Sequence, residues 1–330
     1  MMSGSTEASR IKVSVIIPVY NEGKYIGRCI DSLLVQSFPL SMMEILIIDG
    51  GSNDDTKQII ESYNIDEIKI LHNPKKMVTY ALNIGIDNSI GDYIIRLDAH
   101  AQYAVNYIER CVFYLDNIDA DNVGGVAETR GEGFIGKANA ELLSSRFGVG
   151  NSQFRVNSDK DGFVDTVPFG AFRREIFQKI GKFNEEFPRS EDNDFNSRIR
   201  ENGGKVYLAS DIKFVYYCRD TVRGLLDQGI KNGNALFLTL RKNPKAMSLR
   251  HFVPFFFVCS LIILPLLGSI TSLFNYILFM EMTAYGILDL YFSMFKGSIK
   301  FVFYKFIMYP CFHISYGVGS LIGLFGKKLY

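Results

Sequence analysis

"KVSVIIPVY", residues 12–20, is a nearly continuous run of apolar, mostly β-branched side chains. Such a run is typical of a strand that is buried on both faces, as the strands of parallel sheets are. Polar residues 21–23 interrupt the run. The apolar residues that follow recur at helical spacing: Ile26, Cys29, Ile30, Leu33 and Leu34. This stretch therefore predicts the first strand and the first helix of an α/β sheet.

The same alternation continues along the chain. Three more strand-like runs cover residues 43–49, 68–73 and 92–98. Helices are expected from about Thr56 and over about residues 79–88. Alternating strands and helices predict an open parallel sheet with helices on both faces. In such sheets ligands bind at the carboxyl ends of the strands.

Strand-like and helix-like runs also occur between residues 122 and 217, at less regular spacing. Residues 122–130 and 205–217 have strand character. Residues 168–181 are expected to form a loop that enters a short helix, and residues 190–204 to contain another helix. We expect residues 11–220 to form this α/β domain, after a disordered N-terminus over residues 1–10.

The composition is balanced in charge. Thirty-six Lys and Arg residues face 35 Asp and Glu residues, which gives a formal net charge of +1. So small a net charge provides no general attraction to nucleic acid, and no nucleic-acid partner is expected. The five cysteines are scattered without a C-x-x-C pair, which is typical of reduced, buried thiols in a chain that faces the cytosol.

The composition changes sharply near residue 250. No charged side chain occurs from Phe252 to Met280, a length that suits a membrane span better than a buried core helix. We expect residues 251–330 to hold two or three hydrophobic membrane helices. The preceding residues 221–250 are expected to form an amphipathic interfacial helix and a linker.

Four basic residues lie just before this tail: Arg241, Lys242, Lys245 and Arg250. By the positive-inside rule they indicate that the α/β domain faces the cytosol from the cell membrane. A third full span would carry Lys327 and Lys328 to the opposite side. The third segment is therefore re-entrant or interfacial, or it departs from the rule.

Acidic side chains follow three of the predicted strands: Glu22, Asp49 and Asp98. The glycine-rich phosphate loops of dinucleotide-binding and P-loop proteins are absent. These carboxylates would repel a bare diphosphate, but they suit a nucleotide diphosphate that carries Mg²⁺ or Mn²⁺. In "RLDAHAQY", residues 96–103, His100 stands where a second acid would complete an Asp-x-Asp metal motif.

Five separated motifs resemble those of the inverting family 2 glycosyltransferases with the GT-A fold. They occur in the family's order and spacing over roughly residues 11–217: "SVIIPVYNE", "EILIIDGGSNDDT", "ALNIGIDNSIGDYIIRLDA", "FGAFRREIFQKIGKFNE" and "EDNDFNSRIRENG". The Asp-Gly-Gly-Ser and Asp-Ala-His variants and the hydrophobic tail are similar to the ExoA-like succinoglycan biosynthesis glycosyltransferases. The resemblance implies a hexosyltransferase-type enzyme. It also implies a mixed, mostly parallel Rossmann-like sheet flanked by helices, with a C-terminal transmembrane helical tail.

The resemblance further implies a donor site. Pro18, Tyr20 and Glu22 would line the nucleotide pocket, and Asp49 would accept a hydrogen bond from the base. Asp98 would lie against the ribose and the metal-bound diphosphate. Asp98 and His100 would hold a divalent cation, Mn²⁺ or Mg²⁺, and imidazole is a better ligand for Mn²⁺. A UDP-sugar is favoured as donor. The alternative is a His100 that only hydrogen-bonds phosphate or water.

The acids Glu191, Asp192 and Asp194 match the family's acceptor-side motif, which makes Asp192 the catalytic base. Single displacement at an anomeric carbon needs a carboxylate that takes the acceptor's proton opposite the leaving diphosphate. Acids at a helix start are also ordinary capping residues, which is the structural alternative. The Q-x-x-R-W motif of processive members is absent, because Gln228 is not followed by Arg-Trp. We therefore expect transfer of a single sugar.

The combined expectation is a membrane-associated inverting glycosyltransferase on the cytosolic face of the cell membrane. It would move one sugar from a nucleotide diphosphate to a polyprenyl-linked glycan in extracellular or surface polysaccharide assembly, where other assembly proteins are candidate partners. Two alternatives stay open. One is a polyprenyl-phosphate glycosyltransferase, and the other is a non-catalytic GT-A scaffold protein.

Overall fold

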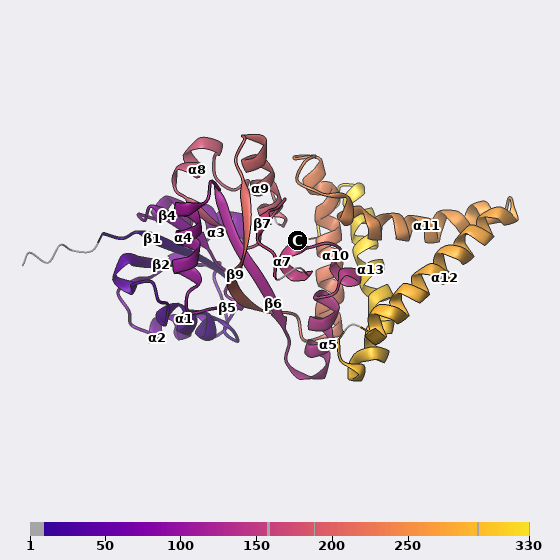
Figure 1. The fold of residues 1–330 in the computed structure, drawn as a ribbon, viewed down its shortest axis with the longest axis horizontal. Coiled ribbons are helices and arrows are strands. Elements are labelled where there is room, and N and C mark those ends of the chain that lie inside the picture. The colour runs from indigo at the N-terminus through magenta and orange to yellow at the C-terminus, as the bar shows by residue number, and fades with distance from the viewer. Residues whose placement is uncertain (1–9, 157–158, 188, 296, 330) are drawn as a thin grey trace, which may run out of the picture. The chain divides into compact units, whose positions relative to one another are not determined.

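The computed structural model describes residues 10–156, 159–187, 189–295 and 297–329. The chain divides into two compact units, and Figure 1 colours the ribbon by residue number. Unit 1 comprises residues 1–126, 160–186 and 198–214, and unit 2 comprises residues 127–159, 187–197 and 215–330. Residues 1–9 of the predicted disordered N-terminus lie outside the described residues.

Unit 1 contains a parallel arrangement of four strands in the order β3–β2–β1–β4. These strands are β1 (Val13–Val19), β2 (Met43–Asp49), β3 (Ile68–His72) and β4 (Tyr93–Arg96). All seven residues of β2 are buried, as expected for a strand covered on both faces. The predicted strands are confirmed. Because the four strands are parallel, their carboxyl ends meet at one edge of the sheet.

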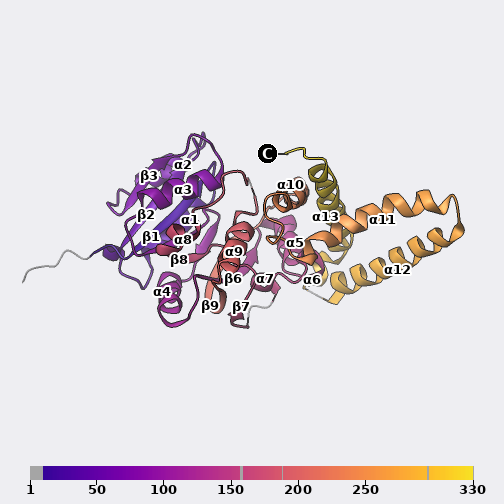
Figure 2. The ribbon, with the colours of Figure 1, turned by 90° about the horizontal axis from the view of Figure 1, so that it is seen from above.

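Helices connect and cover these strands, as Figures 1 and 2 show. They are α1 (Ile26–Leu34), α2 (Thr56–Ser62), α3 (Val78–Asn88), α4 (Tyr107–Asn117) and α8 (Glu175–Ile180), with a 3₁₀ turn η1 (Leu40–Met42) before β2. A Cβ added at Gly85 of α3 would lie 2.4 Å from Cγ2 of Ile16. Glycine therefore lets α3 pack closely on β1, which holds the strand that leads to the pocket described below.

The sheet continues with shorter and antiparallel strands. Beyond β4 the order is β8–β6–β9–β5, and β7 pairs with β9. These strands are β5 (Ala101–Tyr103), β6 (Asn122–Arg130), β7 (Gly162–Phe163), β8 (Ala171–Arg173) and β9 (Val206–Tyr217). Strand β8 is antiparallel to both β4 and β6, so the predicted α/β fold is confirmed with a mixed sheet. The prediction of a loop before α8 is wrong at β8, because three residues are too short to show an alternating pattern.

Unit 2 is mainly helical. Its helices are α5 (Gly133–Leu143), α6 (Arg146–Val149), α7 (Gln153–Val156), α10 (Val222–Leu240), α11 (Val253–Gly268), α12 (Ser272–Phe295) and α13 (Val302–Leu324), with 3₁₀ turns η2 (Leu249–Phe252) and η3 (Ile299–Phe301). Helix α9 (Glu191–Glu201) begins in unit 2 and ends in unit 1.

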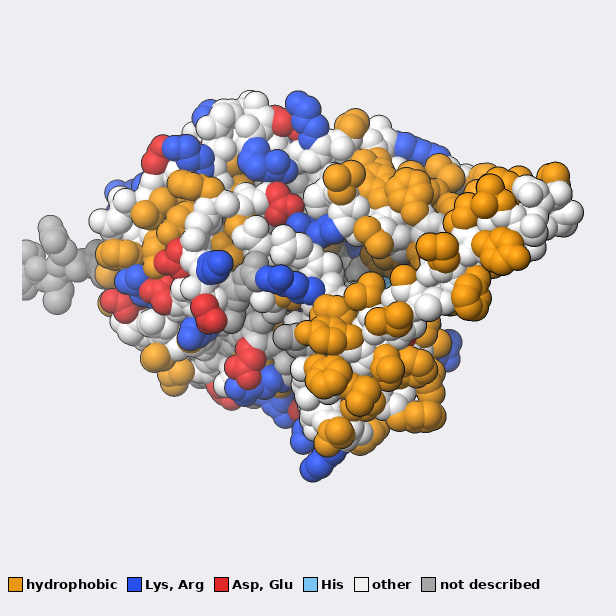
Figure 3. All heavy atoms as spheres, turned by 45° about the vertical axis from the view of Figure 1, so that its right-hand side comes forward, with side chains coloured by type: hydrophobic (Ala, Val, Ile, Leu, Met, Phe, Trp, Pro, Cys, Tyr) orange, Lys and Arg blue, Asp and Glu red, His pale blue; other side chains and the backbone are white. Residues whose placement is uncertain are grey.

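Three helical segments of unit 2 are long and apolar enough to cross a membrane: 249–268, 272–295 and 299–324. The prediction of hydrophobic helices in the tail is therefore confirmed. The first two segments are only 6% and 11% buried within the structure, whereas the third is 50% buried. Hydrophobic side chains cover most of the surface that α11 and α12 present in Figure 3.

Helices α10 and α13 pack side by side through glycines. A Cβ added at Gly233 of α10 would lie 1.9 Å from the carbonyl oxygen of Tyr316, and one added at Gly319 of α13 would lie 2.0 Å from that of Ile230. Gly323 has the same relation to the carbonyl oxygen of Asn234, at 2.4 Å. Small residues at such spacing let two helix backbones approach closely, so one face of α13 packs tightly on α10.

Replacing Gly233 by Ala is expected to destabilise unit 2. The new methyl group must displace a backbone carbonyl, which costs about 1–3 kcal/mol and more than cancels the gain of up to about 1 kcal/mol in helix propensity. Gly286→Ala is the matched control, because a Cβ there meets nothing within 4 Å. In thermal unfolding of the detergent-solubilised protein, Gly233→Ala should melt several degrees lower and Gly286→Ala no lower than the parent. Equal melting temperatures for the two variants would contradict the close packing.

Candidate active site

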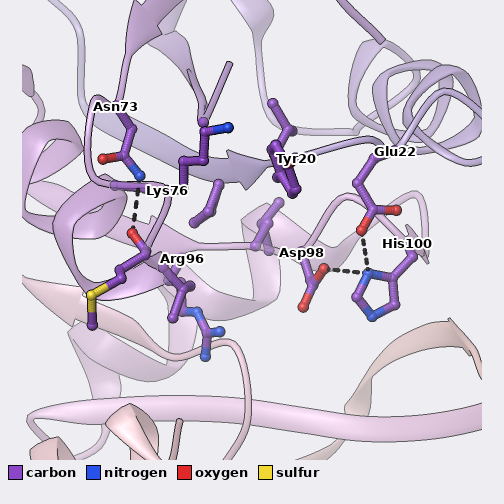
Figure 4. Close-up of a pocket in the computed structure, with 14 residues that line it drawn as sticks. Tyr20, Glu22, Asn73, Lys76, Arg96, Asp98 and His100 are labelled. Carbon is purple, nitrogen blue, oxygen red and sulfur yellow. Dashed lines mark hydrogen bonds and ion pairs between the residues drawn. The ribbon is translucent and has the colours of Figure 1, made fainter. Parts of the chain in front are cut away.

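A pocket lies in unit 1 at the carboxyl ends of β1, β2 and β4. Its lining comes from the end of β1, the residue after β2, the segment that joins β3 to α3, the start of α3 and the end of β4 (Figure 4). The lining residues are Pro18, Val19, Tyr20, Glu22, Gly50, Asn73, Lys76, Met77, Val78, Ala81, Arg96, Leu97, Asp98 and His100. This is the edge at which the parallel strand order predicts a ligand site.

Most of the donor-site residues predicted from the sequence line this pocket, and Asp49 does not. Pro18, Tyr20, Glu22, Asp98 and His100 are all lining residues. The carboxylate of Asp49 instead accepts hydrogen bonds from the backbone N–H of Ser52 at 3.0 Å and from its hydroxyl at 2.6 Å. Asp49 thereby fixes the turn that brings Gly50 to the pocket wall.

Two carboxylates meet one imidazole at the pocket floor. Nδ1 of His100 lies 2.8 Å from Oδ1 of Asp98 and 3.3 Å from Oε1 of Glu22, and Figure 4 shows the three side chains pointing toward one another. Burial opposes ionisation of Asp98, but the electrostatic interaction and hydrogen bond with His100, together with the charge of Arg96, outweigh burial and lower the pKa of Asp98 to about 2. Asp98 is therefore a carboxylate at neutral pH.

The hydroxyl group of Tyr103 holds the backbone of Asp98 through two hydrogen bonds. Its N–H donates to the hydroxyl oxygen of Tyr103 at 2.7 Å, and its carbonyl oxygen accepts from the same hydroxyl at 3.1 Å. Tyr103 and Tyr107 pack edge to face with ring centroids 4.8 Å apart, and both are buried. The strand end that carries Asp98 and His100 is therefore rigidly seated on an aromatic core.

Asp98 and His100 are candidate ligands for a divalent cation. Within the described ranges, no group of three or more His, Cys, Asp or Glu side chains is arranged to hold a metal ion by itself. Nδ1 of His100 is engaged by carboxylates, which leaves Nε2 as its ligating atom, and a carboxylate on the second ring nitrogen is the usual support of a metal-bound histidine. Asp98 and His100 thus fit a cation whose remaining ligands would come from a bound diphosphate.

The structure adds three polar pocket residues that sequence reasoning left unassigned. Asn73 is 2% exposed and shapes its turn by donating to the carbonyl oxygen of Met77 at 3.0 Å. Lys76 has a left-handed backbone, with φ of 56°, and its Nζ lies 5.1 Å from the ring centroid of Tyr20. Left-handed backbone at a non-glycine residue is often kept at functional sites.

Arg96 is the third added residue and the most buried cation of the pocket lining. It is 5% exposed at the end of β4, and its guanidinium carbon lies 5.5 Å from the ring centroid of Phe169. The sequence held a signal for it, since Arg96 interrupts the apolar run "DYIIRLD". A charged residue inside a strand buried on both faces needs a polar environment, such as a ligand site.

The acceptor-side acids lie on the first turn of α9. Glu191, Asp192 and Asp194 are all in that turn, where the positive end of the helix favours negative charge. Ser190, immediately before the helix, has a left-handed φ of 66°. The pocket residues belong to unit 1, whereas these three acids belong to unit 2.

Asp194 anchors the start of α9 within unit 2. It is 2% exposed, and its Oδ1 accepts a hydrogen bond from Nδ2 of Asn243 at 2.9 Å. Oδ1 of Asn243 in turn accepts from the backbone N–H of Lys245 at 3.1 Å. Asp194 is therefore committed to holding the helix, whereas Asp192 is only partly buried.

Comparisons with known proteins agree with this architecture. A sequence model of the family described as "Glycosyl transferase family 2" matches residues 14–181. A relative from Methanococcus voltae is 29% identical over 273 residues, which is 79% of this chain and 84% of that protein. It is named "Dolichyl N-acetyl-alpha-D-glucosaminyl phosphate 3-beta-D-2,3-diacetamido-2,3-dideoxy-beta-D-glucuronosyltransferase". "Succinoglycan biosynthesis protein ExoA" of Rhizobium meliloti is 28% identical over 254 residues, which is 76% of both chains.

A solved structure has the same fold. It is "Mannosyltransferase PcManGT from Pyrobaculum calidifontis in complex with GDP-Man and Mn2+", with a TM-score of 0.68 over 97% of this chain and 88% of that chain. The two sequences are 16% identical, so this likeness bears on the fold alone. The GT-A fold expected from the five sequence motifs is confirmed.

Proposed function

The chain belongs to glycosyl transferase family 2, and from this premise we propose that it is a membrane-associated inverting enzyme. It moves one sugar from a nucleotide diphosphate to a lipid-linked glycan in the assembly of a surface polysaccharide. The observation that carries the proposal is the pocket in which Asp98, His100 and Glu22 meet at the carboxyl ends of β1 and β4. The names of two relatives, one acting on a dolichyl-phosphate sugar and one in succinoglycan biosynthesis, support the acceptor class.

The pocket's charges suit a nucleoside diphosphate. Lys76 and Arg96 supply positive charge to the phosphates, and the exposed ring of Tyr20 offers a stacking face for the base. A divalent cation held by Asp98 and His100 would disperse the negative charge that develops on the leaving diphosphate. Mn²⁺ suits the imidazole ligand better than Mg²⁺ does.

Asp192 is the base of the proposed reaction. Its carboxylate takes the proton of the acceptor hydroxyl while the hydroxyl oxygen bonds to the anomeric carbon of the donor sugar. The bond from that carbon to the diphosphate breaks, and its electron pair leaves with the nucleoside diphosphate. Attack opposite the leaving group inverts the anomeric configuration.

The apolar tail suits an enzyme whose acceptor is held in the membrane. The apolar surface of α11 and α12 suits lipid, and the basic residues Arg241, Lys242 and Arg250 before α11 support a position on the cytosolic side. Nucleotide sugars are made in that compartment, so orientation and chemistry agree.

A transfer assay with two acceptors tests the proposal. The purified full chain is incubated in lipid with radiolabelled nucleotide sugars, Mn²⁺ and either a polyprenyl-linked oligosaccharide or bare polyprenyl phosphate. Label should pass to the oligosaccharide with inverted configuration. Transfer to bare polyprenyl phosphate alone would replace the proposal by a polyprenyl-phosphate glycosyltransferase. Turnover with neither acceptor and no donor hydrolysis would indicate a scaffold protein.

Nucleotide binding is expected to depend on the cation. At about 100 times the Kd, a ligand adds about 2.7 kcal/mol to the stability of the folded state, which is readily visible in a thermal-shift assay. UDP with Mn²⁺ should raise the melting temperature more than UDP with Mg²⁺. UDP with EDTA and GDP with Mn²⁺ are the controls. An equal shift with EDTA would show that no cation takes part in binding.

Lys76→Met is expected to weaken donor binding. Loss of one charge-assisted hydrogen bond to a phosphate costs about 1.5–3 kcal/mol, roughly a tenfold to hundredfold rise in Kd. The matched control is Lys57→Met, because Lys57 is an exposed lysine of α2 paired with Glu61 four residues on. Isothermal titration with UDP and Mn²⁺ measures both variants. A Kd for Lys76→Met equal to that of the control would remove Lys76 from the site.

A further inference from the structure

We infer that α11 and α12 form a re-entrant hairpin that enters one leaflet of the bilayer and returns to the same side, while α13 does not cross. The inference rests on the proposed membrane association. It goes beyond that proposal by assigning the helices that contact the hydrocarbon. It also states that no segment of the chain crosses the membrane completely.

Helix α13 is held at its beginning by a polar residue of unit 2. The carboxylate of Glu141 on α5 accepts hydrogen bonds from the backbone N–H of Ser298 at 2.8 Å and from Nζ of Lys305 at 2.9 Å. Lys305 is 0% exposed. A buried, paired lysine in its first turn means that this face of α13 packs against unit 2 rather than against lipid.

The other end of α13 is also held by unit 2. The side-chain amide of Asn234 on α10 donates to the carbonyl oxygen of Lys327 at 2.8 Å, and Arg241 donates to that of Leu324. Between the two ends, α13 runs parallel to α10, since Gly229 meets Ser315 and Asn234 meets Gly323. Helix α10 carries an Asp227–Lys231 ion pair at its middle, which has no place in hydrocarbon. A helix that runs alongside α10 for most of its length stays on the same side as α10.

The apolar segment 249–268 is long enough to cross a membrane, but helix α11 makes up only its last 16 residues. The 20-residue apolar segment includes the turn η2, and η2 is tied to unit 2 because Arg250 donates to the carbonyl oxygen of Asn151. The remaining 16 residues of α11 span about 24 Å at 1.5 Å per residue, less than the hydrocarbon core of about 30 Å. Its first turns also pack on α13, where a Cβ at Gly317 would lie 2.4 Å from the carbonyl oxygen of Pro254.

The position of the first acid on α12 limits the depth of insertion. The uncharged part of α12, from Ser272 to Met280, is about 14 Å long at 1.5 Å per residue. That length is about half of the hydrocarbon core, or one leaflet. Glu281 follows it, and its carboxylate accepts a hydrogen bond from the hydroxyl of Ser260 on α11 at 2.7 Å. A tip inserted by one leaflet leaves Glu281 at the headgroup level.

The hairpin tip is built for an environment without water. It carries no charge, and Ile270 at its apex is 80% exposed. Its backbone carbonyls have partners within the tip, since Ser269 donates from its hydroxyl to Leu266 at 2.7 Å and Asn275 donates from its amide to Gly268 at 3.1 Å. In hydrocarbon each carbonyl left without a donor would cost several kcal/mol.

Site-specific labelling tests the topology. Cys259 and Cys311, the partly exposed native cysteines, are replaced by Ala in the full chain, and Cys29, Cys111 and Cys218 are kept because they are buried. Single cysteines are then placed as Ile270→Cys at the tip, Lys328→Cys after α13 and Glu61→Cys in unit 1. The variants are reconstituted in phosphatidylcholine vesicles with phosphatidylglycerol and treated with a membrane-impermeant maleimide before and after permeabilisation.

We expect Glu61→Cys and Lys328→Cys to be labelled to the same extent in intact vesicles and to be fully labelled after permeabilisation. Ile270→Cys should not be labelled in either condition. A nitroxide at Ile270→Cys should be relaxed by oxygen and not by a water-soluble nickel complex. If Ile270→Cys is labelled from the side of the membrane opposite to the side that labels Glu61→Cys, then α11 and α12 are two spans and the inference is overturned. Labelling of Lys328→Cys opposite to Glu61→Cys would show that α13 crosses. Aqueous labelling of Ile270→Cys on the Glu61 side would place the hairpin outside the bilayer.

Failure of the inference and failure of the proposed function are separable. Flotation of the same vesicles reports membrane association, and the transfer assay reports catalysis. A protein that does not float contradicts both the membrane association and the hairpin. A protein that floats and transfers sugar, but shows a labelled tip, contradicts only the topology.

Discussion

Asp192→Asn is expected to lower the turnover number about 1000-fold while leaving the affinity for the nucleotide sugar unchanged. Proton removal by a positioned carboxylate contributes about 100-fold to 10,000-fold to such reactions, and an amide cannot accept the proton. The donor contacts proposed above come from Asp98, His100, Lys76 and Arg96, none of which is altered. The measurement is single-turnover transfer kinetics beside donor titration in the presence of Mn²⁺.

The control for this variant is Asp227→Asn. Asp227 is an exposed acid of unit 2, paired with Lys231 one helical turn along α10, so its replacement makes the same chemical change on a helix other than α9. It should retain full turnover. If Asp192→Asn keeps the parental turnover number, the base is another residue, and Glu191 is then the next candidate for the same replacement.

Asp98→Asn is expected to abolish cation-dependent donor binding together with transfer. The change removes the carboxylate that faces the cation and the diphosphate. A loss of several kcal/mol of charge stabilisation corresponds to a fall of about 1000-fold or more in kcat/KM. The thermal shift caused by UDP with Mn²⁺ should disappear. His100 keeps Glu22 at 3.3 Å as a carboxylate partner, so the apo protein should melt near the parental temperature.

Asp92→Asn is the matched control for Asp98→Asn. Asp92 lies just before β4 and pairs on the surface with Arg10 at 2.7 Å, and exposed pairs of this kind contribute about 1 kcal/mol or less. Its variant should bind UDP with Mn²⁺ as the parent does. Parental donor affinity in Asp98→Asn would show that the nucleotide binds elsewhere.

The parallel half of the sheet was predictable from sequence because its strands are buried on both faces. Uninterrupted apolar runs such as 43–49 have few alternative structures, and their polar ends, at Glu22 and Asp98, marked the pocket edge. The antiparallel strand β8 was missed because its pairing with β4 and β6 involves residues far apart in the chain. Such pairing leaves no local pattern in three residues.

The sequence indicated where the side chains of the site lie along the chain, but not which residues they contact. The sequence put His100 where a metal ligand belongs, yet its contact with both Asp98 and Glu22 depends on how β1 and β4 are registered. The contact of Asp49 with the base stays a prediction, and the sequence did not reveal that the hydroxyl of Ser52, three residues on, donates to its carboxylate. Lys76 reaches the pocket through a left-handed turn, a conformation that composition alone does not reveal.

The hydrophobic tail was likewise predictable in composition but not in its packing contacts. Its hydrophobicity was evident from composition, because no charge occurs between Phe252 and Met280. The difference in burial between α12 and α13 was not evident, since their segments have the same mean hydropathy of 1.2. It arises from the partners of Lys305 and from glycines that lie on facing helices.

The glycines between α10 and α13 have a consequence for how this protein can change over generations. In most helix pairs a larger side chain on one partner is accommodated by a smaller one on the other. Here the atoms facing Gly233 and Gly319 are main-chain carbonyl oxygens, which no substitution can shrink, and glycine itself has nothing smaller to replace it. Mutational drift at these positions cannot be rescued one residue at a time. Descendants that keep this helix pair must therefore keep its glycines.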